Sequence, residues 1–426
     1  MSNRHRLAYV YVRNAAVAGM LLCVGAGLFA ADAELPSHEH AALPEDATLT
    51  LAGAVDAAFQ IYPATIELAA RTGQADAWTD RGHSWLADRP SLVLRLQTDR
   101  WGSDAGLDEY EAGIQLPLWN PGGRSAVQDY GAAFTEESAT ADLALRWEVA
   151  GMLRGALWAI ALAENDHELA DQALDTAERL AKSVERRYEL GDVALSDVLL
   201  AQSAYLEAQT SLIEATAALL DAERGYRSLT GLERRPAFLG EALSQSHDVE
   251  PDHPALAFAN AAVTRAEAGL AVAEKTANTG ASLLLGSRSE RPAFGDQFDD
   301  SLGITVSIPF GGSAHRRTEI SAAARTAASA RATRNAQIRT LTLELHEAAH
   351  GLNVVSENLT SATERMKLAE RHQAMSEVAY EKGELELIDL LKVQSTAIAA
   401  KRQVTRLLID EKRQTALYNQ AVGKLP

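Results

Sequence analysis

Three stretches of the chain alternate between apolar and polar residues, a pattern that predicts β-strands with one apolar and one polar face. The apolar positions are Leu92, Leu94 and Leu96; Ala112, Ile114, Leu116 and Leu118; and Leu302, Ile304, Val306 and Ile308. A segment rich in Gly and Asp, 102–108, separates the first two stretches and suits a hairpin loop. We therefore expect short antiparallel strands, two in each half of the chain.

Long segments between these strands predict helices. Residues 125–190 contain no proline and are rich in Ala, Leu, Glu and Arg, which predicts one helix of roughly 100 Å at about 1.5 Å per residue. Gly191 is expected to end it, and Asp192 or Ser196 to cap the next helix, which runs to about Leu229. Further helices are predicted over 63–88, 254–279, 314–382 and 385–421. In each half the two shorter helices together match the long one, so we expect them to stack end to end along it.

The second half of the chain repeats the first. Tyr188, Gly191 and Asp197 correspond to Tyr380, Gly383 and Asp389, in a register without gaps that relates 177–231 to 369–423. Each half then has the same order of parts: a short helix, two strands, a very long helix, a glycine turn and a medium helix. This order predicts a first structural repeat over 34–231 and a second over 232–426.

The strand count limits what one chain can build. Four strands cannot close into a barrel, and an open sheet edge is not stable in lipid, so strands that cross a membrane require several chains. The predicted fold class is mainly α with a small β part: a long antiparallel helical tunnel, with four strands per chain contributing to a trimeric, twelve-stranded transmembrane β-barrel. A small soluble sheet packed on helices is the alternative, because the strand pattern alone is not specific.

The N-terminus has the pattern of a secretory signal peptide over residues 1–33. Three arginines precede an apolar segment, 15–29, that is too short for a membrane-spanning helix, and a cleavage site follows at Ala31-Asp-Ala33. An uncleaved anchor is the alternative. Cleavage would remove Cys23, the only cysteine of the chain, and no acyl anchor is predicted there. The net charge of -18 argues against nucleic-acid binding, which requires clustered Lys and Arg.

Short motifs mark the ends of the predicted elements. They are Leu49-Thr-Leu-Ala-Gly-Ala-Val55 before Pro63, Leu116-Pro-Leu-Trp119 before Gly122-Gly-Arg124, Ile308-Pro-Phe-Gly-Gly312, Arg187-Tyr-x-x-Gly191 before Ser196-Asp197, Tyr380-x-x-Gly383 before Asp389, and Ser228-Leu-Thr-Gly231. These motifs and the twofold order of parts resemble the TolC-type outer-membrane efflux family, over nearly the whole chain after the signal segment. Within the family the chain looks nearest to the CzcC-like branch, which serves heavy-metal exporters.

The resemblance implies a passive export duct and not an enzyme. It implies a homotrimer in the outer membrane, in contact with outer-membrane lipid, with a large periplasmic part and no cofactor. It also implies two partners, a periplasmic adaptor and an inner-membrane pump of the RND type, and heavy-metal cations as the exported solute. A periplasmic adaptor or coiled-coil scaffold is the alternative from another class, although an adaptor would not repeat a strand pair and a helix pair.

The resemblance also implies where the functional residues lie. The two helix-hairpin tips would dock the adaptor through Arg187, Tyr188, Gly191, Asp197, Tyr380 and Gly383. Glu384, Glu386 and Asp389 would form an acidic tunnel entrance. Lys392 stands where some family members carry a second acidic residue. The chain therefore departs from the pattern in which aspartates of the three subunits form two rings at the entrance. The alternative role for these acids is to complement the positive N-terminal end of a helix.

One motif points to different chemistry. His346-Glu-Ala-Ala-His350 has the H-E-x-x-H form of zinc proteases, in which two histidines one turn apart bind the metal and the glutamate acts as a base. The motif lies within the predicted helix over 314–382, without an evident third ligand or cleft-building domain. We therefore predict no catalytic residue and no metal site, and expect these side chains to lie on an exposed helix face.

Overall fold

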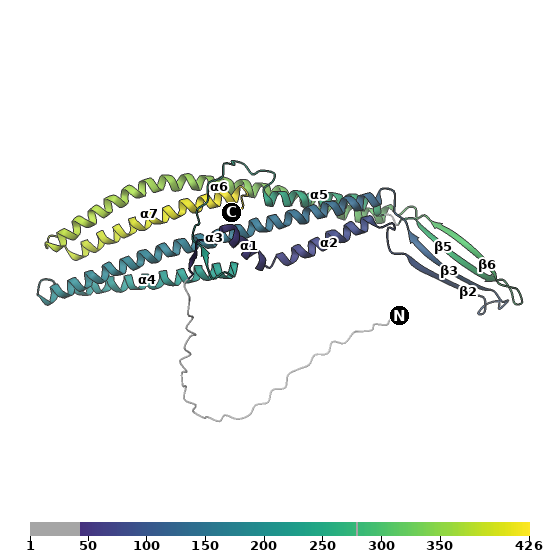
Figure 1. The fold of residues 1–426 in the computed structure, drawn as a ribbon, viewed down its shortest axis with the longest axis horizontal. Helices are drawn as coiled ribbons and strands as arrows, with labels where there is room; N and C mark the ends of the chain where they lie inside the picture. The colour runs from purple at the N-terminus through teal and green to yellow at the C-terminus, as the bar shows by residue number, and fades with distance from the viewer. Residues whose placement is uncertain (1–42, 278–279) are drawn as a thin grey trace, which may run out of the picture. The chain divides into compact units, whose positions relative to one another are not determined.

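Two very long helices carry the fold of the computed structural model, which describes residues 43–277 and 280–426. Helix α3 spans Gly123–Glu189 and α6 spans Ser313–Glu381, with 67 and 69 residues. At about 1.5 Å per residue each is roughly 100 Å long. Both lie along the longest axis of the picture (Figure 1). The predicted signal peptide and its cleavage site lie outside the described residues.

Shorter helices stack end to end along each long one. Helix α2 (Thr65–His83) packs on the first part of α3, where Thr72 Oγ1 lies 3.1 Å from Ser138 Oγ, and α4 (Leu195–Thr230) packs on the second part. In the second half, α5 (Pro254–Thr276) and α7 (Leu387–Ala421) cover α6 in the same way. The stacking expected from helix lengths is therefore confirmed. Helix α2 ends five residues before the expected boundary at 88, at a turn that Ser84 and Leu86 close.

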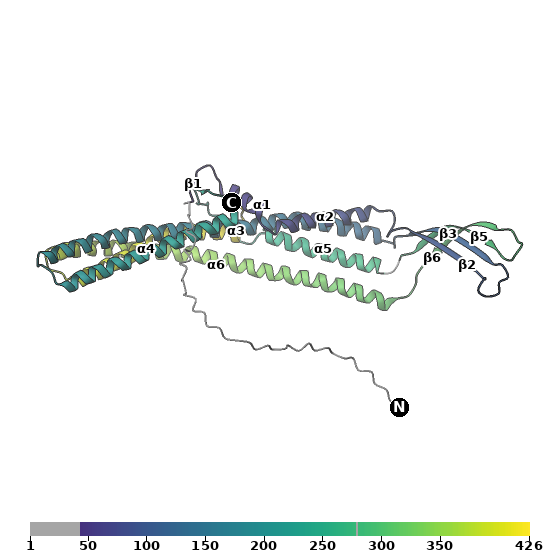
Figure 2. The same cartoon turned by 90° about the horizontal axis from the view of Figure 1, so that it is seen from below.

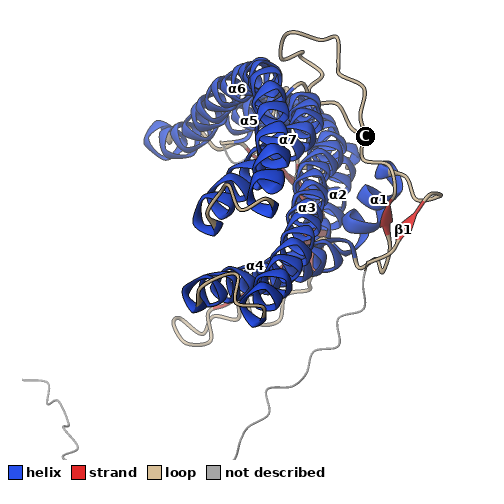
Figure 3. Ribbon diagram, turned by 90° about the vertical axis from the view of Figure 1, so that its left-hand side faces the viewer, coloured by secondary structure: helices blue, strands red, loops and turns tan. Residues whose placement is uncertain are grey.

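The helices form an arc (Figure 3). Helix α3 packs against α2, α4, α5 and α7, whereas α6 packs against α5 and α7. The arc therefore has α6 at one end and α2 followed by α4 at the other. Across the part of the chain that the structure describes, no helix has the length and apolar character required to cross a membrane.

The strands lie beyond one end of the helices (Figure 2). They are β2 (Ser91–Thr98), β3 (Asp108–Pro117), β5 (Ser282–Arg291) and β6 (Asp299–Ser307), and they form one antiparallel sheet in the order β2-β3-β5-β6. The central pair β3 and β5 joins the two halves of the chain. The two outer loops, 99–107 and 292–298, join the strands at the end of the sheet away from the helices. A Cβ at Gly106 would lie only 2.3 Å from the backbone nitrogen of Phe294, so the two loops contact each other closely at this glycine.

A small layer at the middle of α3 was not predicted. Helix α1 (Leu51–Ile61) begins at Thr50, whose hydroxyl accepts from Gly53 N at 3.0 Å. Short strands β1 (Glu45–Asp46) and β4 (Arg235–Pro236) pair in parallel beside it. The apolar side of α1 packs against α3 and α4 at the junction where α2 and α4 meet, and the buried residues there are Ala54, Val55, Ala58, Val149, Ala150, Leu153, Leu157, Ile160 and Tyr226.

Candidate functional site

The sheet has two chemically different faces. The pairing register places most apolar side chains of the four strands on one face: Leu92, Leu94, Leu96, Tyr110, Ala112, Ile114, Leu116, Leu283, Leu285, Leu302, Ile304 and Val306. Leu94 is 71% exposed and Leu302 is 91% exposed, so no part of the described chain covers this face. The alternation in the sequence thus produces an apolar surface four strands wide.

The opposite face is polar and carries charged pairs. Arg95 lies 3.7 Å from Glu111 of the neighbouring strand, and Arg288 pairs with both Glu109 and Glu290. Three glycines, Gly113, Gly286 and Gly303, lie side by side across the middle of this face. Strands β2 and β6 are the two edges, and each has one side without a strand partner in the described chain.

Exposed aromatic residues stand at both ends of the sheet. Trp101 and Phe294 lie in the outer loops, with Tyr110 and Phe298 in ring contact beside them at 5.9 Å between centroids. Trp85 and Phe310 lie at the end next to the helices, and Phe310 is 98% exposed. Aromatic side chains at both ends of an apolar band are typical of strands that cross a bilayer, because these rings favour the lipid–water interface.

The other ends of the long helices form two turns built in the same way. Gly191 has φ +80° and Gly383 has φ +76°, conformations that residues with a Cβ rarely adopt. In the first turn, Asp192 N donates to Arg187 O at 2.9 Å, and in the second, Glu384 N donates to Ala379 O at 2.9 Å. These are Schellman motifs, in which a left-handed glycine reverses the chain after the last helical turn.

Capping of α4 differs from the prediction. Its N-cap residue is Ala194, without a side-chain bond to the helix, so neither Asp192 nor Ser196 caps it. Asp192 instead accepts from Arg187 Nε at 2.6 Å. Asp192 therefore stabilises the turn in which it lies, because the preceding helix places the Arg187 guanidinium within hydrogen-bonding distance.

Arg187 and Tyr380 connect the two hairpin tips. The guanidinium carbon of Arg187 lies 5.0 Å from the centroid of the Tyr380 ring. Tyr380 is only 8% exposed and belongs to an apolar cluster with Val184, Val198 and Ala201 of the first hairpin and Leu387 and Leu390 of the second. Burial raises the pKa of Tyr380, although the positive charge of Arg187 opposes the shift. The ring therefore stays neutral, and the guanidinium covers it.

The remaining predicted tip residues are more accessible. Tyr188 is 42% exposed, and Gly191 and Gly383 are exposed at the turns. Glu384 and Glu386 are exposed and make no ion pair in the described part of the chain. Asp389 lies in the first turn of α7, where it complements the helix dipole, and Lys392 Nζ binds it at 3.0 Å. The structure thus brings the three predicted acids to one turn, with Asp389 partly neutralised.

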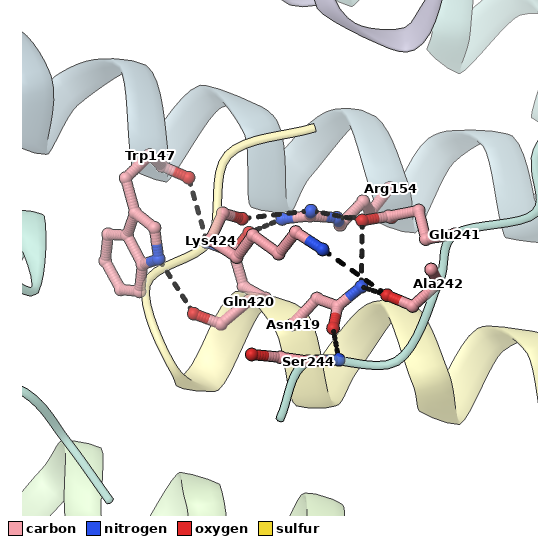
Figure 4. Close-up of polar contacts among 8 residues, drawn as sticks. All are labelled: Trp147, Arg154, Glu241, Ala242, Ser244, Asn419, Gln420 and Lys424. Carbon is pink, nitrogen blue, oxygen red and sulfur yellow. Dashed lines mark hydrogen bonds and ion pairs between the residues drawn. The ribbon is translucent and has the colours of Figure 1, made fainter. Parts of the chain in front are cut away.

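A buried polar cluster that sequence reasoning missed holds the end of α7 against the middle of α3 (Figure 4). Arg154 forms two bonds with Glu241, at 2.8 and 2.6 Å, and their side chains are 3% and 8% exposed. Asn419 Nδ2 donates to the same carboxylate at 3.2 Å. Trp147 Nε1 donates to Gln420 O at 2.8 Å, and Gln420 Nε2 donates back to Trp147 O at 2.8 Å. The cluster ties α3, α7 and the crossover segment 232–253 together.

The H-E-x-x-H motif has no third protein ligand for a metal among the described residues. His346, Glu347 and His350 are all exposed in the middle of α6. Across residues 43–277 and 280–426 no group of three or more His, Cys, Asp or Glu side chains could hold a metal ion. A catalytic zinc needs three protein ligands and an open position, so the two histidines alone do not provide protease chemistry.

The comparison with protein families agrees with this geometry. Residues 80–232, from the end of α2 to just after α4, match the family model described as outer membrane efflux protein. Over these residues the chain is similar to outer membrane efflux proteins. A comparison with curated proteins found no match.

Solved outer-membrane channels share the fold of this chain. It is similar to the outer membrane protein VceC from Vibrio cholerae, with a TM-score of 0.71 and 14% identity over 88% of this chain and 96% of VceC. The CmeC outer membrane channel of Campylobacter jejuni gives a TM-score of 0.69 and 14% identity over 88% of this chain and 85% of CmeC. CusC gives a TM-score of 0.71 and 13% identity over 91% of this chain and 99% of CusC. At such identities the likeness concerns the fold alone.

Proposed function

We propose that three copies of this channel protein close into one duct, which exports solutes delivered by a periplasmic adaptor and an inner-membrane pump of the RND type. The observation that carries the proposal is the sheet with an apolar face, a polar face and two unpaired edges. Joining β6 of one copy to β2 of the next, three times, gives a closed sheet of twelve strands. The apolar faces then contact lipid, and the charged faces surround water.

Unpaired helix faces at the two ends of the arc support the same assembly. Leu199, Leu206 and Ile213 of α4 are exposed and lie seven residues apart. Leu368 and Met375 of α6 repeat this spacing. Apolar residues at heptad spacing form the seam of a coiled coil, so α4 of one copy would pack against α6 of the next.

The register of this seam follows from the tip cluster. Tyr380 and Ala201 both belong to that cluster, and we take them as level with each other along the helix axes. Met375 lies five residues further from the tip than Tyr380, and Leu206 lies five residues further from it than Ala201. Leu368 and Ile213 lie seven residues further still. These two pairs would therefore meet across the subunit boundary, because α4 and α6 run in opposite directions.

The hairpin tips are the proposed adaptor-docking and entrance region. The exposed Tyr188, Gly191 and Gly383 would contact the adaptor, while Arg187 and Tyr380 would hold the two hairpins together and keep the entrance narrow. The exposed carboxylates of Glu384 and Glu386, repeated in three copies, would favour cations at the entrance. We propose divalent heavy-metal cations as the exported solute on this basis.

Crosslinking tests the assembly directly. Oxidation of a Leu206→Cys, Met375→Cys variant in outer membranes should give a covalent trimer on a denaturing gel, and each single variant should not. Electron microscopy of the extracted protein should show threefold end views. Monomers in both experiments would contradict the proposed duct. Loss of export after deletion of the adaptor, with trimers intact, would separate the partner proposal from the assembly proposal.

A further inference from the structure

The two histidines of the H-E-x-x-H motif lie on the outside of a regular helix. His346 and His350 are four residues apart within α6, far from either end of the helix. Residues at this spacing lie on one face with Cβ atoms about 5–6 Å apart. Both side chains are exposed, and in the described part of the chain neither imidazole makes a hydrogen bond or an ion pair. Both rings are therefore available to the same small ligand.

From this arrangement we propose that His346 and His350 together bind one divalent transition-metal ion on the surface of α6. Two imidazole nitrogens one turn apart can each reach an ion at about 2.0–2.1 Å, the normal metal–nitrogen distance. Imidazole suits Cu²⁺, Ni²⁺ and Zn²⁺, and Cu²⁺ binds most tightly in that series. Neither ring requires a change of the helix backbone, because the helix already places both on one face.

Charges around the pair favour a cation. Glu344 and Glu347 lie within one turn of the pair, and neither carboxylate is in an ion pair with a Lys or Arg among residues 43–277 and 280–426. The whole chain carries a net charge of -18. A negative local field raises the concentration of cations near the two rings.

The proposed site has only two protein ligands and is therefore an open, exchangeable site. The remaining coordination positions are left to water, so the ion exchanges with solution and the site differs from a structural or catalytic zinc centre. The inference does not depend on the proposed export function, because it concerns one helix face of a single chain.

Copper binding by the intact protein provides the test. The protein is extracted from membranes as it exists, purified without a histidine tag and titrated with Cu²⁺. We expect one tight ion per chain, with electron paramagnetic resonance showing two coordinated nitrogens. His346→Gln or His350→Gln should each weaken binding by about 10- to 100-fold, at least the loss seen when a supporting group is removed from a metal site.

A matched control lies on the same helix. His372 is also exposed on α6 but has no histidine one turn away, so His372→Gln should leave the affinity unchanged. Glu347→Gln should also retain the two-nitrogen spectrum, which distinguishes this site from a protease motif. Equal affinity in the wild type and in the His346→Gln, His350→Gln double variant would overturn the proposal. Threefold particles in that double variant would show that the duct assembles whether or not the metal site exists.

Discussion

The guanidinium of Arg187 lies over the ring of Tyr380, with its carbon 5.0 Å from the ring centroid, and so joins the last turns of α3 and α6. The same guanidinium binds Asp192 of its own turn. One arginine thus fixes the shape of the first tip and its position against the second. We expect this contact to decide how far the two hairpins separate.

Removing that contact should loosen the entrance. Replacing Arg187 with Ala removes a cation–π contact worth about 0.5–2 kcal/mol and leaves Asp192 without its partner. Single-channel conductance of the reconstituted protein should rise. Tyr188→Ala changes a neighbouring side chain that lies outside the apolar tip cluster, so it should leave conductance unchanged. Equal conductance of wild type and Arg187→Ala would contradict a gating role.

A side chain at the glycine of either turn should destabilise the folded protein. Gly383→Ala places a Cβ at φ +76°, which costs about 1–2 kcal/mol. Gly73→Ala is the matched control, because Gly73 lies inside α2, where an added Cβ meets nothing within 4 Å. There alanine should stabilise the helix by about 0.5–1 kcal/mol. Thermal unfolding should therefore shift in opposite directions, and a shared direction would count against the left-handed turn.

The buried pair between Arg154 and Glu241 should matter more than exposed pairs. Arg154→Met leaves Glu241 buried without its cation, which is expected to cost about 3–5 kcal/mol. Arg331→Met removes a pair with Glu267 in which both side chains are exposed, and should cost at most about 1 kcal/mol. Thermal unfolding in detergent compares the two variants. Adding Glu241→Gln to Arg154→Met should restore part of the loss, because it removes the unpaired charge.

Charge on the two faces of the sheet should have different effects. Leu94→Arg puts a cation on the exposed apolar face, and at the middle of a bilayer this costs about 2–4 kcal/mol. Val93→Arg, one residue earlier, places the same charge on the polar face opposite Gly113. We expect less trimer in outer membranes for the first variant and wild-type amounts for the second. Equal reduction would argue against lipid contact of the apolar face.

Acidification should destabilise the protein through His253. The ring is 1% exposed and packs against Trp147 at 4.9 Å between centroids, and burial lowers its pKa below 6.5 despite the nearby charge of Asp252. Below about pH 6.5 the unfolded chain binds a proton that the folded chain does not, so stability falls as the pH falls. His253→Asn keeps an acceptor for Ala255 N but does not titrate. Its unfolding temperature should therefore change less between pH 7.5 and 5.5 than that of the wild type.

The long elements and their order were predictable from local patterns. Helical composition without proline marked α3 and α6 to within a few residues, and period-two alternation marked β2, β3 and β6. Gly191 and Gly383 could be recognised because a left-handed turn requires glycine. These features depend on the conformations open to each short segment, which neighbouring residues largely decide.

Partners between distant segments required the tertiary structure. Nothing near Asp192 indicated that it would bind Arg187 instead of capping α4, and no pattern around Glu241 pointed to Arg154 or Asn419. Likewise, burial of Tyr380 depends on where the first hairpin lies. The sequence by itself determined the lengths, periodicities and turns of this protein, because those follow from local backbone preference and amphipathic spacing. Only the tertiary structure decided which polar groups meet, because that depends on the packing of helices far apart in the chain.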